Sequence, residues 1–184
     1  NLEGKKVLVQ GIGHVGEVLV QHLTESGALV TITDINEDRV NQVGAKHGAK
    51  IFTGADLYSA DVDIYAPCAL GATINDATIN NFKASIIAGA ANNQLANEAV
   101  HGKILKEKGI LYAPDFLINA GGVINVYSEL VKWTNAQVME KTENIYNTAL
   151  EIFKFADDNN ITTHQAAFSM AQKRIDDAKN ELKK

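Results

Sequence analysis

Three glycines and one aspartate near the N-terminus have the types and the spacing of a site that holds a dinucleotide. Gly11, Gly13 and Gly16 form the pattern G-x-G-x-x-G, and Asp34 follows at the separation of about 20 residues that this fingerprint has. Gly11 would allow a tight turn, Gly13 would let a pyrophosphate approach the backbone, and Gly16 would let a helix pack on a strand. The N-terminus of that helix would offer N–H groups to the anion, with His14 as an exposed residue of its first turn.

Asp34 indicates which dinucleotide would bind. Its carboxylate can accept hydrogen bonds from both ribose hydroxyls and would repel a 2′-phosphate, which favours NAD over NADP. Arg39 lies nearby in the sequence and leaves NADP as an alternative. The other interpretation of this stretch is a plain strand–turn–helix connection in which Asp34 caps the helix that begins near Asn36. The matched context favours the cofactor site.

Small and amide side chains follow two further apolar segments. Cys68-Ala69-Leu70 comes after one of them, and Ala90-Ala91-Asn92-Asn93 comes after the next. Small residues would let a flat ring approach the backbone, and an Asn amide offers the donor and the acceptor that a nicotinamide carboxamide needs. Asn92 and Asn93 could equally cap the following helix, and the residues alone leave both interpretations open. Cys68 is expected to be a small, buried residue and not a nucleophile.

Strand-like and helix-like segments alternate over the first two thirds of the chain. The expected strands are residues 6–10, 29–34, 50–53, 62–67, 85–89 and 110–113, and the expected helices between them are residues 14–26, 37–47 and 97–108. Gly27, Gly48 and Gly109 follow these helices as C-terminal stops. The alternation predicts an α/β, Rossmann-type, doubly wound and mostly parallel sheet, with a dinucleotide-binding domain over residues 1–133.

The last third of the chain is expected to be helical. Helices are predicted over residues 119–133, 134–158 and 162–182, and the last two open with the capping-box pattern Thr-x-x-Gln at Thr134 and Thr162. Residues 134–184 are therefore predicted to form a helical extension that packs on the Rossmann domain. Part of its apolar stripes could instead belong to a surface that faced a further domain. Val123 and Val126 share a helix face and would, taken alone, be assigned to the core.

Composition excludes several classes of function. The formal net charge is −5, and Lys and Arg do not gather into one patch, so no nucleic-acid partner is expected. The single cysteine excludes an internal disulfide and indicates a reducing compartment, for which the cytoplasm is expected. No apolar run is long enough to span a bilayer. The five histidines have no metal-ligand spacing, so no metal is expected.

Four stretches of the chain are long enough to be specific. They are APCALGATIND, AGAANNQL, HGKILKEKGILYAPDFLINAGGVINV, and AAFSMAQKRI over residues 166–175. Together they resemble the cofactor-binding domain of the glutamate/leucine/phenylalanine/valine dehydrogenase family, and its leucine dehydrogenases most closely. The resemblance covers nearly the whole chain.

The resemblance implies a cofactor, a reaction and a set of site residues. It implies that NAD binds, that Asn92 and Asn93 lie near the nicotinamide and the substrate, and that Val123 and Val126 line a pocket for an aliphatic side chain. The implied reaction is the reversible oxidative deamination of an aliphatic L-amino acid, leucine by the closest match, to the 2-oxo acid and ammonia. The residues expected at the cofactor are Gly11, Ile12, Gly13, His14, Val15, Gly16, Asp34, Ile35, Cys68, Ala69, Leu70, Ala90, Asn92 and Asn93.

The chain departs from the family where its catalytic groups should be. In the family the catalytic lysines and an Asp belong to an N-terminal domain, and one lysine stands in a Gly-Gly-x-Lys motif. Here Gly121-Gly122 is followed by Val-Ile, and the chain begins without an initiator Met. We therefore expect an isolated cofactor domain, inactive alone, with no catalytic residue of its own, whose parent is a homo-oligomer. The alternatives are a non-catalytic NAD-sensing module and a methyltransferase.

Overall fold

The computed structural model describes residues 1–181 and divides the chain into two compact units. One unit is Asn1–Asn119, and the other begins at Ala120. The sequence pattern placed the division between residues 133 and 134, whereas the contacts place it before the helix α5 (Gly121–Val131), which packs with the helix that follows it.

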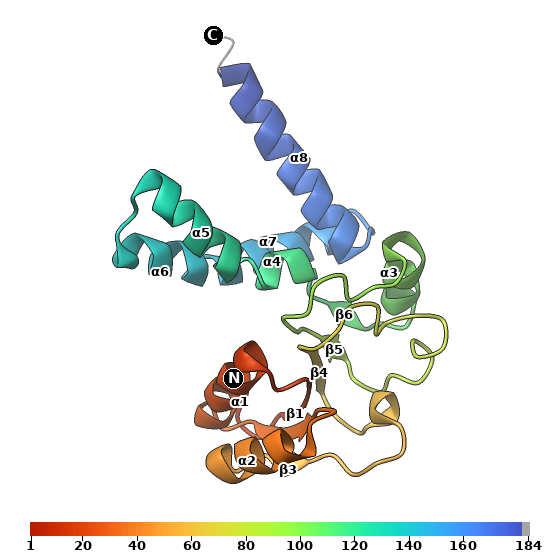
Figure 1. The fold of residues 1–184 in the computed structure, drawn as a ribbon. Coiled ribbons are helices and arrows are strands. Elements are labelled where there is room, and N and C mark those ends of the chain that lie inside the picture. The colour runs from red at the N-terminus through yellow and green to blue at the C-terminus, as the bar shows by residue number, and fades with distance from the viewer. Residues whose placement is uncertain (182–184) are drawn as a thin grey trace. The chain divides into compact units, whose positions relative to one another are not determined.

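The first unit is built on a six-stranded, wholly parallel sheet in the order β3-β2-β1-β4-β5-β6 (Figure 1). Its strands are β1 (Lys6–Gln10), β2 (Leu29–Thr33), β3 (Lys50–Ile51), β4 (Ile64–Pro67), β5 (Ile86–Ile87) and β6 (Leu111–Tyr112). Val7 lies beside Val30 of β2 and Ile64 of β4, so the strand order reverses on either side of β1. The predicted Rossmann-type sheet is confirmed, and ligands of such sheets bind at the carboxyl ends of the strands where the order reverses.

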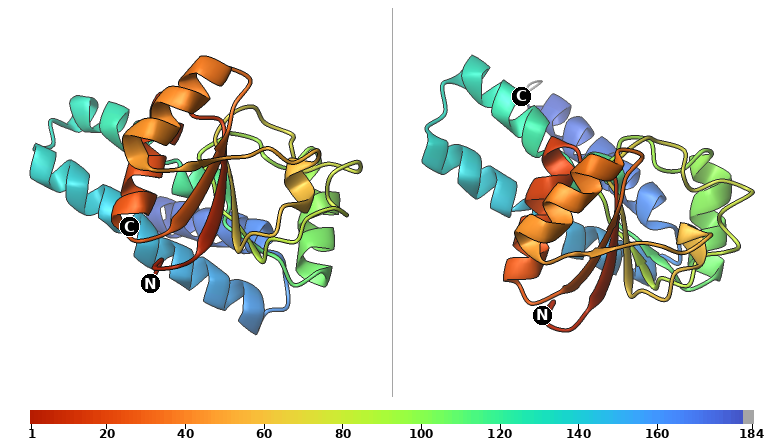
Figure 2. Two further views of the ribbon diagram at one scale, coloured as in Figure 1. Left: turned by 90° about the horizontal axis from the view of Figure 1, so that it is seen from below. Right: turned by 60° about the horizontal axis from the view of Figure 1, so that its bottom comes forward.

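Helices cover both faces of the sheet (Figure 2). They are α1 (His14–Glu25) and α2 (Glu37–His47) on one face and α3 (Glu98–Glu107) on the other, with a short 3₁₀ turn η1 (Leu57–Ser59) and a one-turn helix α4 (Asp115–Ile118) in the connections. Val7 and Val9 of β1 pack with the α1 and α2 side, while Leu8 packs with Leu105 of α3. This alternation buries β1 on both sides, as expected for a central parallel strand.

The helix ends follow the expected chemistry. Asn36 caps α2 by accepting a hydrogen bond from the N–H of Arg39 at 3.0 Å, and Asn97 caps α3 by accepting one from the N–H of Val100 at 3.1 Å. Gly48 ends α2 in the left-handed conformation at a φ of 69°, which glycine adopts without strain. The predicted bounds of these helices are confirmed to within a residue.

The second unit consists of helices alone. They are α5 (Gly121–Val131), α6 (Asn135–Glu143), α7 (Ile145–Asp158) and α8 (Thr163–Glu181). Both predicted capping boxes form, at Thr134 with Gln137 and at Thr162 with Gln165. No helix among the described residues is both long and apolar enough to cross a membrane.

Two predicted helices of this unit were too long. The helix expected over residues 119–133 begins at Gly121 and ends at Val131, because Lys132 turns to a left-handed φ of 55°. The single helix expected over residues 134–158 is wrong at Asn144, whose ψ of −11° departs from the helical value and separates α6 from α7. Asparagine is a poor residue inside a helix because its side chain competes for backbone partners. The last residue predicted for the third helix, Leu182, lies outside the described residues.

Candidate functional site

The turn between β1 and α1 leaves no room for side chains at two of its glycines. Gly11 has a φ of +90°, and a Cβ there would lie 2.5 Å from the Cβ of Ala69. A Cβ at Gly16 would lie 2.1 Å from the carbonyl oxygen of Gly11. Both distances are far below van der Waals contact, so glycine at these positions is explained by packing within the chain.

Gly13 has no such explanation from its own surroundings. Its φ of −58° is one that any residue adopts, and a Cβ there would meet nothing within 4 Å. Neither strain nor a neighbour in the chain requires glycine, whereas a ligand lying against the backbone would require it. The open space at Gly13 therefore fits the pyrophosphate position that the fingerprint predicts.

Helix α1 differs from the two other long helices of this unit at its N-terminus. Gly13 occupies the N-cap position of α1 and has no side chain to accept a hydrogen bond from the first turn, whereas Asn36 and Asn97 cap α2 and α3. His14, the first residue of α1, is exposed. The N–H groups of this first turn are thus available to an anion at the turn, where the helix dipole also favours negative charge.

Asp34 lies directly beside the turn. Its Oδ2 accepts a hydrogen bond from the N–H of Ile12 at 2.8 Å, and its Oδ1 accepts one from the N–H of Asn36 at 3.0 Å. Partial burial acts to raise the pKa of Asp34, but the backbone N–H groups of Ile12, Asn36 and Ile35 outweigh it and hold that pKa below its ordinary value. Asp34 is therefore a carboxylate at neutral pH and keeps acceptor capacity for a ribose hydroxyl.

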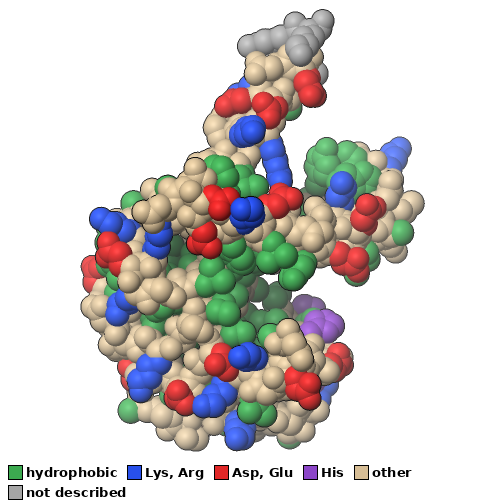
Figure 3. Space-filling model, turned by 180° about the vertical axis from the view of Figure 1, so that it is seen from behind, with side chains coloured by type: hydrophobic (Ala, Val, Ile, Leu, Met, Phe, Trp, Pro, Cys, Tyr) green, Lys and Arg blue, Asp and Glu red, His purple; other side chains and the backbone are tan. Residues whose placement is uncertain are grey.

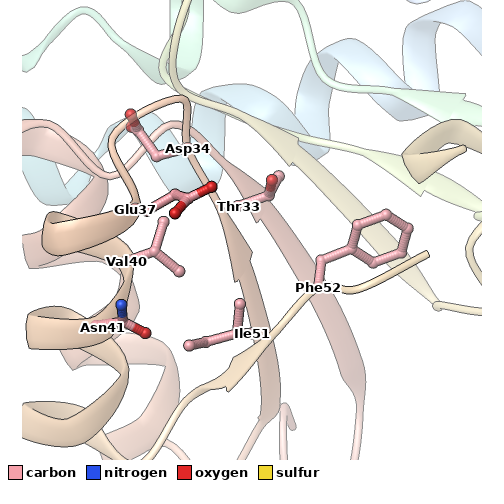
Figure 4. A pocket seen from close by; sticks show the side chains of 7 residues that line it. All are labelled: Thr33, Asp34, Glu37, Val40, Asn41, Ile51 and Phe52. Atoms are coloured by element: carbon pink, nitrogen blue, oxygen red, sulfur yellow. The ribbon is translucent and has the colours of Figure 1, made fainter. Parts of the chain in front are cut away.

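A cavity of about 290 Å³ lies next to Asp34 (Figure 4). Residues from β2, α2 and β3 line it: Thr33, Asp34, Glu37, Val40, Asn41, Ile51 and Phe52. Asp34 and Glu37 place two acidic side chains at its rim, so the cavity disfavours a phosphate group. Glu37 was missed as a site residue from the sequence, where its only signal is an acidic residue in the first turn of the helix that follows Asp34.

The loops after β4 and β5 approach each other backbone to backbone. The N–H of Ala72 donates to the carbonyl oxygen of Asn93 at 2.7 Å, and a Cβ at Gly71 would lie 2.5 Å from the carbonyl oxygen of Asn92. The Oδ1 of Asn92 accepts a hydrogen bond from the Nδ2 of Asn119 at 2.6 Å. These contacts fix the position of Asn92 and Asn93 at the same edge of the sheet as the glycine-rich turn.

The alternative role for Asn92 and Asn93 is wrong. The next helix, α3, begins at Glu98 and is capped by Asn97, so neither residue caps it. Asn93 instead takes a left-handed φ of 52°, and both side chains are exposed. The nicotinamide-binding role remains open to them.

Gln94 supports this loop and was not singled out from the sequence. It is fully buried, and its Nε2 donates to the carbonyl oxygens of Gly89 at 2.6 Å and Ala91 at 3.0 Å. Its backbone N–H donates to the Oδ2 of the buried Asp115 at 3.3 Å. A Gln that repeats the amide chemistry of its neighbours gives no sequence signal for burial.

Several apolar side chains expected at the cofactor are exposed. Val15, Ile35 and Leu70 have exposed fractions of 59%, 103% and 80%. They follow the ends of β1, β2 and β4, which places them along one edge of the sheet. Apolar side chains beside polar groups at a sheet edge are typical of a site for a flat ring system. Ile12, in contrast, is fully buried below the turn.

Contacts within the first unit account for the states of Cys68 and His101. Burial raises the pKa of the Cys68 thiol, so it stays protonated at neutral pH, as expected for an inert residue. His101 uses both ring nitrogens, since its Nδ1 accepts from the N–H of Asn97 at 2.9 Å and its Nε2 lies 3.0 Å from the Oδ1 of Asp76. Within residues 1–181 no three His, Cys, Asp or Glu side chains lie together as metal ligands, and no lysine is buried.

Val123 and Val126 lie on α5 in the second unit. Their exposed fractions are 73% and 64%, and Tyr127 and Leu130 on the same helix are exposed as well. Hydrophobic side chains accordingly reach the surface of this unit (Figure 3). The interpretation of both valines as core residues is wrong.

Comparison with known proteins identifies relatives along the whole chain. Residues 32–182 match the Glutamate/Leucine/Phenylalanine/Valine dehydrogenase family. The chain is 45% identical over 183 residues to an L-tryptophan dehydrogenase of Nostoc punctiforme and 48% identical over 176 residues to a leucine dehydrogenase of Thermoactinomyces intermedius. It covers 52% of the first relative and 48% of the second, so the chain spans about half the length of the curated relatives it matches.

Solved structures agree with the sequence comparison. The crystal structure of L-tryptophan dehydrogenase from Nostoc punctiforme superimposes with a TM-score of 0.93 at 46% identity, over 97% of this chain and 54% of that one. A hetero-hexameric glutamate dehydrogenase from Thermus thermophilus has a TM-score of 0.75 at 21% identity, over 97% of this chain and 47% of that one. At this lower identity the similarity concerns the fold alone.

Proposed function

This chain belongs to the glutamate/leucine/phenylalanine/valine dehydrogenase family, and from that premise we propose that it is the NAD(H)-binding domain of an amino-acid dehydrogenase. The observation that carries the proposal is the open backbone at Gly13, which lies before the uncapped first turn of α1 and beside Asp34. A dinucleotide laid along this edge would have N–H groups for its pyrophosphate and a carboxylate for its adenosine ribose.

We propose NAD rather than NADP as the cofactor. Asp34 is ionised at neutral pH, and Glu37 adds a second acidic side chain to the cavity beside it. A ribose 2′-phosphate would approach both carboxylates and be repelled by them. A ribose 2′-hydroxyl would instead donate a hydrogen bond to Asp34.

Replacing Asp34 by alanine tests this cofactor assignment. The change removes the ribose acceptor and the partner of the Ile12 N–H, so we expect NADH to bind about 1–3 kcal/mol more weakly. The Asp34→Asn variant keeps an acceptor oxygen but loses the charge, so it should recover part of the NADH affinity and reduce the discrimination against NADPH. Isothermal titration of both cofactors measures both effects. An Asp34→Ala protein that binds NADH as tightly as the unmodified chain would contradict the assignment.

The reaction that we propose for the intact protein is the reversible oxidative deamination of an L-amino acid. The amino acid, NAD⁺ and water would give the 2-oxo acid, an ammonium ion, NADH and a proton, and bound NAD⁺ would accept the hydride. The Asn92 amide, held by Asn119, would orient the nicotinamide and the substrate on this chain. We propose that the acid–base groups come from an N-terminal catalytic domain, since the chain spans about half the length of its relatives and Ile124 stands where the family's Gly-Gly-x-Lys motif has its lysine.

We propose an aliphatic substrate, leucine above all. Val123 and Val126 are exposed on one face of α5 and would offer a substrate an apolar wall that holds no polar partner for a charged side chain. A glutamate side chain placed there would lose its solvation without gaining a hydrogen bond. The relatives include both leucine and L-tryptophan dehydrogenases, so the preference between aliphatic and aromatic substrates depends on the space that this wall leaves.

Enlarging Val126 to phenylalanine in the complete enzyme tests the pocket. The larger ring should crowd the site and penalise leucine relative to alanine by about 1–3 kcal/mol in kcat/KM, the scale of a methylene-sized mismatch. Relative kcat/KM values for leucine, valine, alanine and tryptophan measure the ranking, and thermal unfolding reports on the fold. An unchanged ranking with a large loss of stability would refute the pocket, whereas an unmodified enzyme that prefers tryptophan would refute the aliphatic assignment alone.

Localisation and assembly follow from the same proposal. The single, partly buried, protonated Cys68 is compatible with a reducing compartment, and we propose the cytoplasm. We propose that the intact enzyme is a homo-oligomer.

Membership of the dehydrogenase family rules out the alternative of a methyltransferase, while a non-catalytic NAD-sensing module remains the rival function. A catalytic domain encoded upstream in the intact gene would exclude that rival.

A further inference from the structure

Both backbone polar groups of Ile12, at the centre of the glycine-rich turn, are held by side chains. Its N–H donates to the Oδ2 of Asp34 at 2.8 Å, and its carbonyl oxygen accepts a hydrogen bond from the Nε of Arg39. The Ile12 side chain is fully buried beneath the turn. Arg39 therefore connects α2 to the peptide that directly precedes Gly13.

The guanidinium of Arg39 is itself held by a carboxylate of α1. Its Nη2 lies 3.1 Å from the Oε2 of Glu17, and the Nζ of Lys46 lies 2.7 Å from the Oε1 of the same residue. The side chains of Arg39 and Glu17 are 38% and 26% exposed, so this pair is better shielded from water than an ordinary surface ion pair. The hydrogen bond from Lys46 and the positive charges of Lys46 and Arg39 lower the pKa of Glu17. The Glu17 side chain is therefore ionised at neutral pH.

We propose that Arg39 is a positioning residue of the glycine-rich turn and not a ligand for a ribose 2′-phosphate. From the sequence alone, Arg39 was the residue that left binding of NADP open as an alternative. Two of its three guanidinium nitrogens are engaged within the chain, Nε by the Ile12 carbonyl and Nη2 by the Glu17 carboxylate. Holding the Ile12 carbonyl fixes the orientation of the peptide that leads into Gly13 and α1, and so pre-orders the N–H groups that would face a pyrophosphate.

This inference rests on the proposed cofactor, and it predicts an effect that is common to both dinucleotides. NADH and NADPH share the pyrophosphate, so loosening the turn should weaken both by a similar factor. A phosphate ligand would act differently, because its loss would weaken NADPH alone. A purely structural ion pair would lower the melting temperature and leave the affinity for NADH unchanged.

The test compares Arg39→Ala, Arg39→Lys and Glu17→Gln, with Arg174→Ala as the matched control. Arg174 also pairs with a glutamate, Glu151 at 3.5 Å, but it lies on α8 in the second unit. We expect Arg39→Ala to weaken NADH and NADPH about tenfold each, the scale of one charge-assisted hydrogen bond. Arg39→Lys should not restore binding, because an ammonium cannot contact the carbonyl and the carboxylate through a planar fork. Glu17→Gln should weaken binding in the same direction, and Arg174→Ala should not.

Amide hydrogen exchange of the ligand-free proteins gives a second readout that needs no cofactor. The N–H of Ile12 should exchange several-fold faster in Arg39→Ala than in the unmodified chain, and not in Arg174→Ala. Unchanged NADH affinity, a loss confined to NADPH, or unchanged exchange at Ile12 would each overturn the positioning role. If the unmodified chain binds neither dinucleotide, the proposed function fails, and the exchange rates still decide whether Arg39 braces the turn.

Discussion

Replacing Gly13 by valine is expected to abolish dinucleotide binding while leaving the fold intact. The backbone at Gly13 has an ordinary φ of −58°, and a Cβ there meets no atom of the chain within 4 Å, so the side chain can be accommodated in the ligand-free protein. It would fill the space that a pyrophosphate must enter to reach the first turn of α1. We expect NADH affinity to fall at least about 100-fold, as a blocked anion contact of some 3 kcal/mol implies. Titration calorimetry measures the loss, and thermal unfolding shows that the fold persists.

Gly16 provides the matched control for this experiment. A Cβ at Gly16 would lie 2.1 Å from the carbonyl oxygen of Gly11, so Gly16→Ala must displace backbone and should destabilise the protein by about 1–3 kcal/mol. The Gly13→Val protein should therefore lose NADH binding and keep its thermal stability, whereas the Gly16→Ala protein should lose thermal stability. A Gly13→Val protein that binds NADH normally would show that no pyrophosphate lies against this turn.

The chain by itself is expected to produce no NADH from leucine and NAD⁺ at an enzymatic rate. Acid–base and electrostatic groups each contribute factors of about 100 or more to such reactions. The pair Gly121-Gly122 is followed by Val123 and Ile124, so an isoleucine stands where the family's Gly-Gly-x-Lys motif has its lysine. The rate should therefore lie below detection by absorbance at the NADH maximum.

A binding control makes this negative result informative. The same preparation should bind NADH, which shows that the cofactor site is intact while turnover is missing. Adding the N-terminal half of the intact enzyme, or assaying the complete protein, should restore NADH production. Robust production of NADH by the purified chain alone, saturable in leucine, would show that the catalytic groups lie within it.

The fold was largely predictable because its signals are local. The parallel strands are rich in apolar residues, and left-handed glycines and Asn caps mark the helix ends, so the order of strands and helices in the first unit could be predicted from residues 1–119. The division before Ala120 could not, because it depends on which helices pack together. The break at Asn144 also escaped prediction, since the sequence does not show whether a single asparagine inside an otherwise helical pattern interrupts the helix.

The candidate site was predictable only where spacing carries the chemistry. Gly11, Gly13, Gly16 and Asp34 have the spacing of a dinucleotide fingerprint, and the structure places them at one turn. The sequence does not show in which direction a long side chain extends. It therefore could not tell whether the guanidinium of Arg39 faces a bound phosphate or the glycine-rich turn.

One calorimetric titration of the unmodified chain with NADH, NAD⁺ and NADPH tests the central claim most directly. The proposed NAD-binding domain should bind NADH and NAD⁺ with one site per chain and bind NADPH at least about tenfold more weakly, because one charged ribose contact is worth about 1–3 kcal/mol. Equal affinity for NADH and NADPH would contradict the role of Asp34, and the absence of binding by all three would contradict the assignment of this chain as a dinucleotide-binding domain.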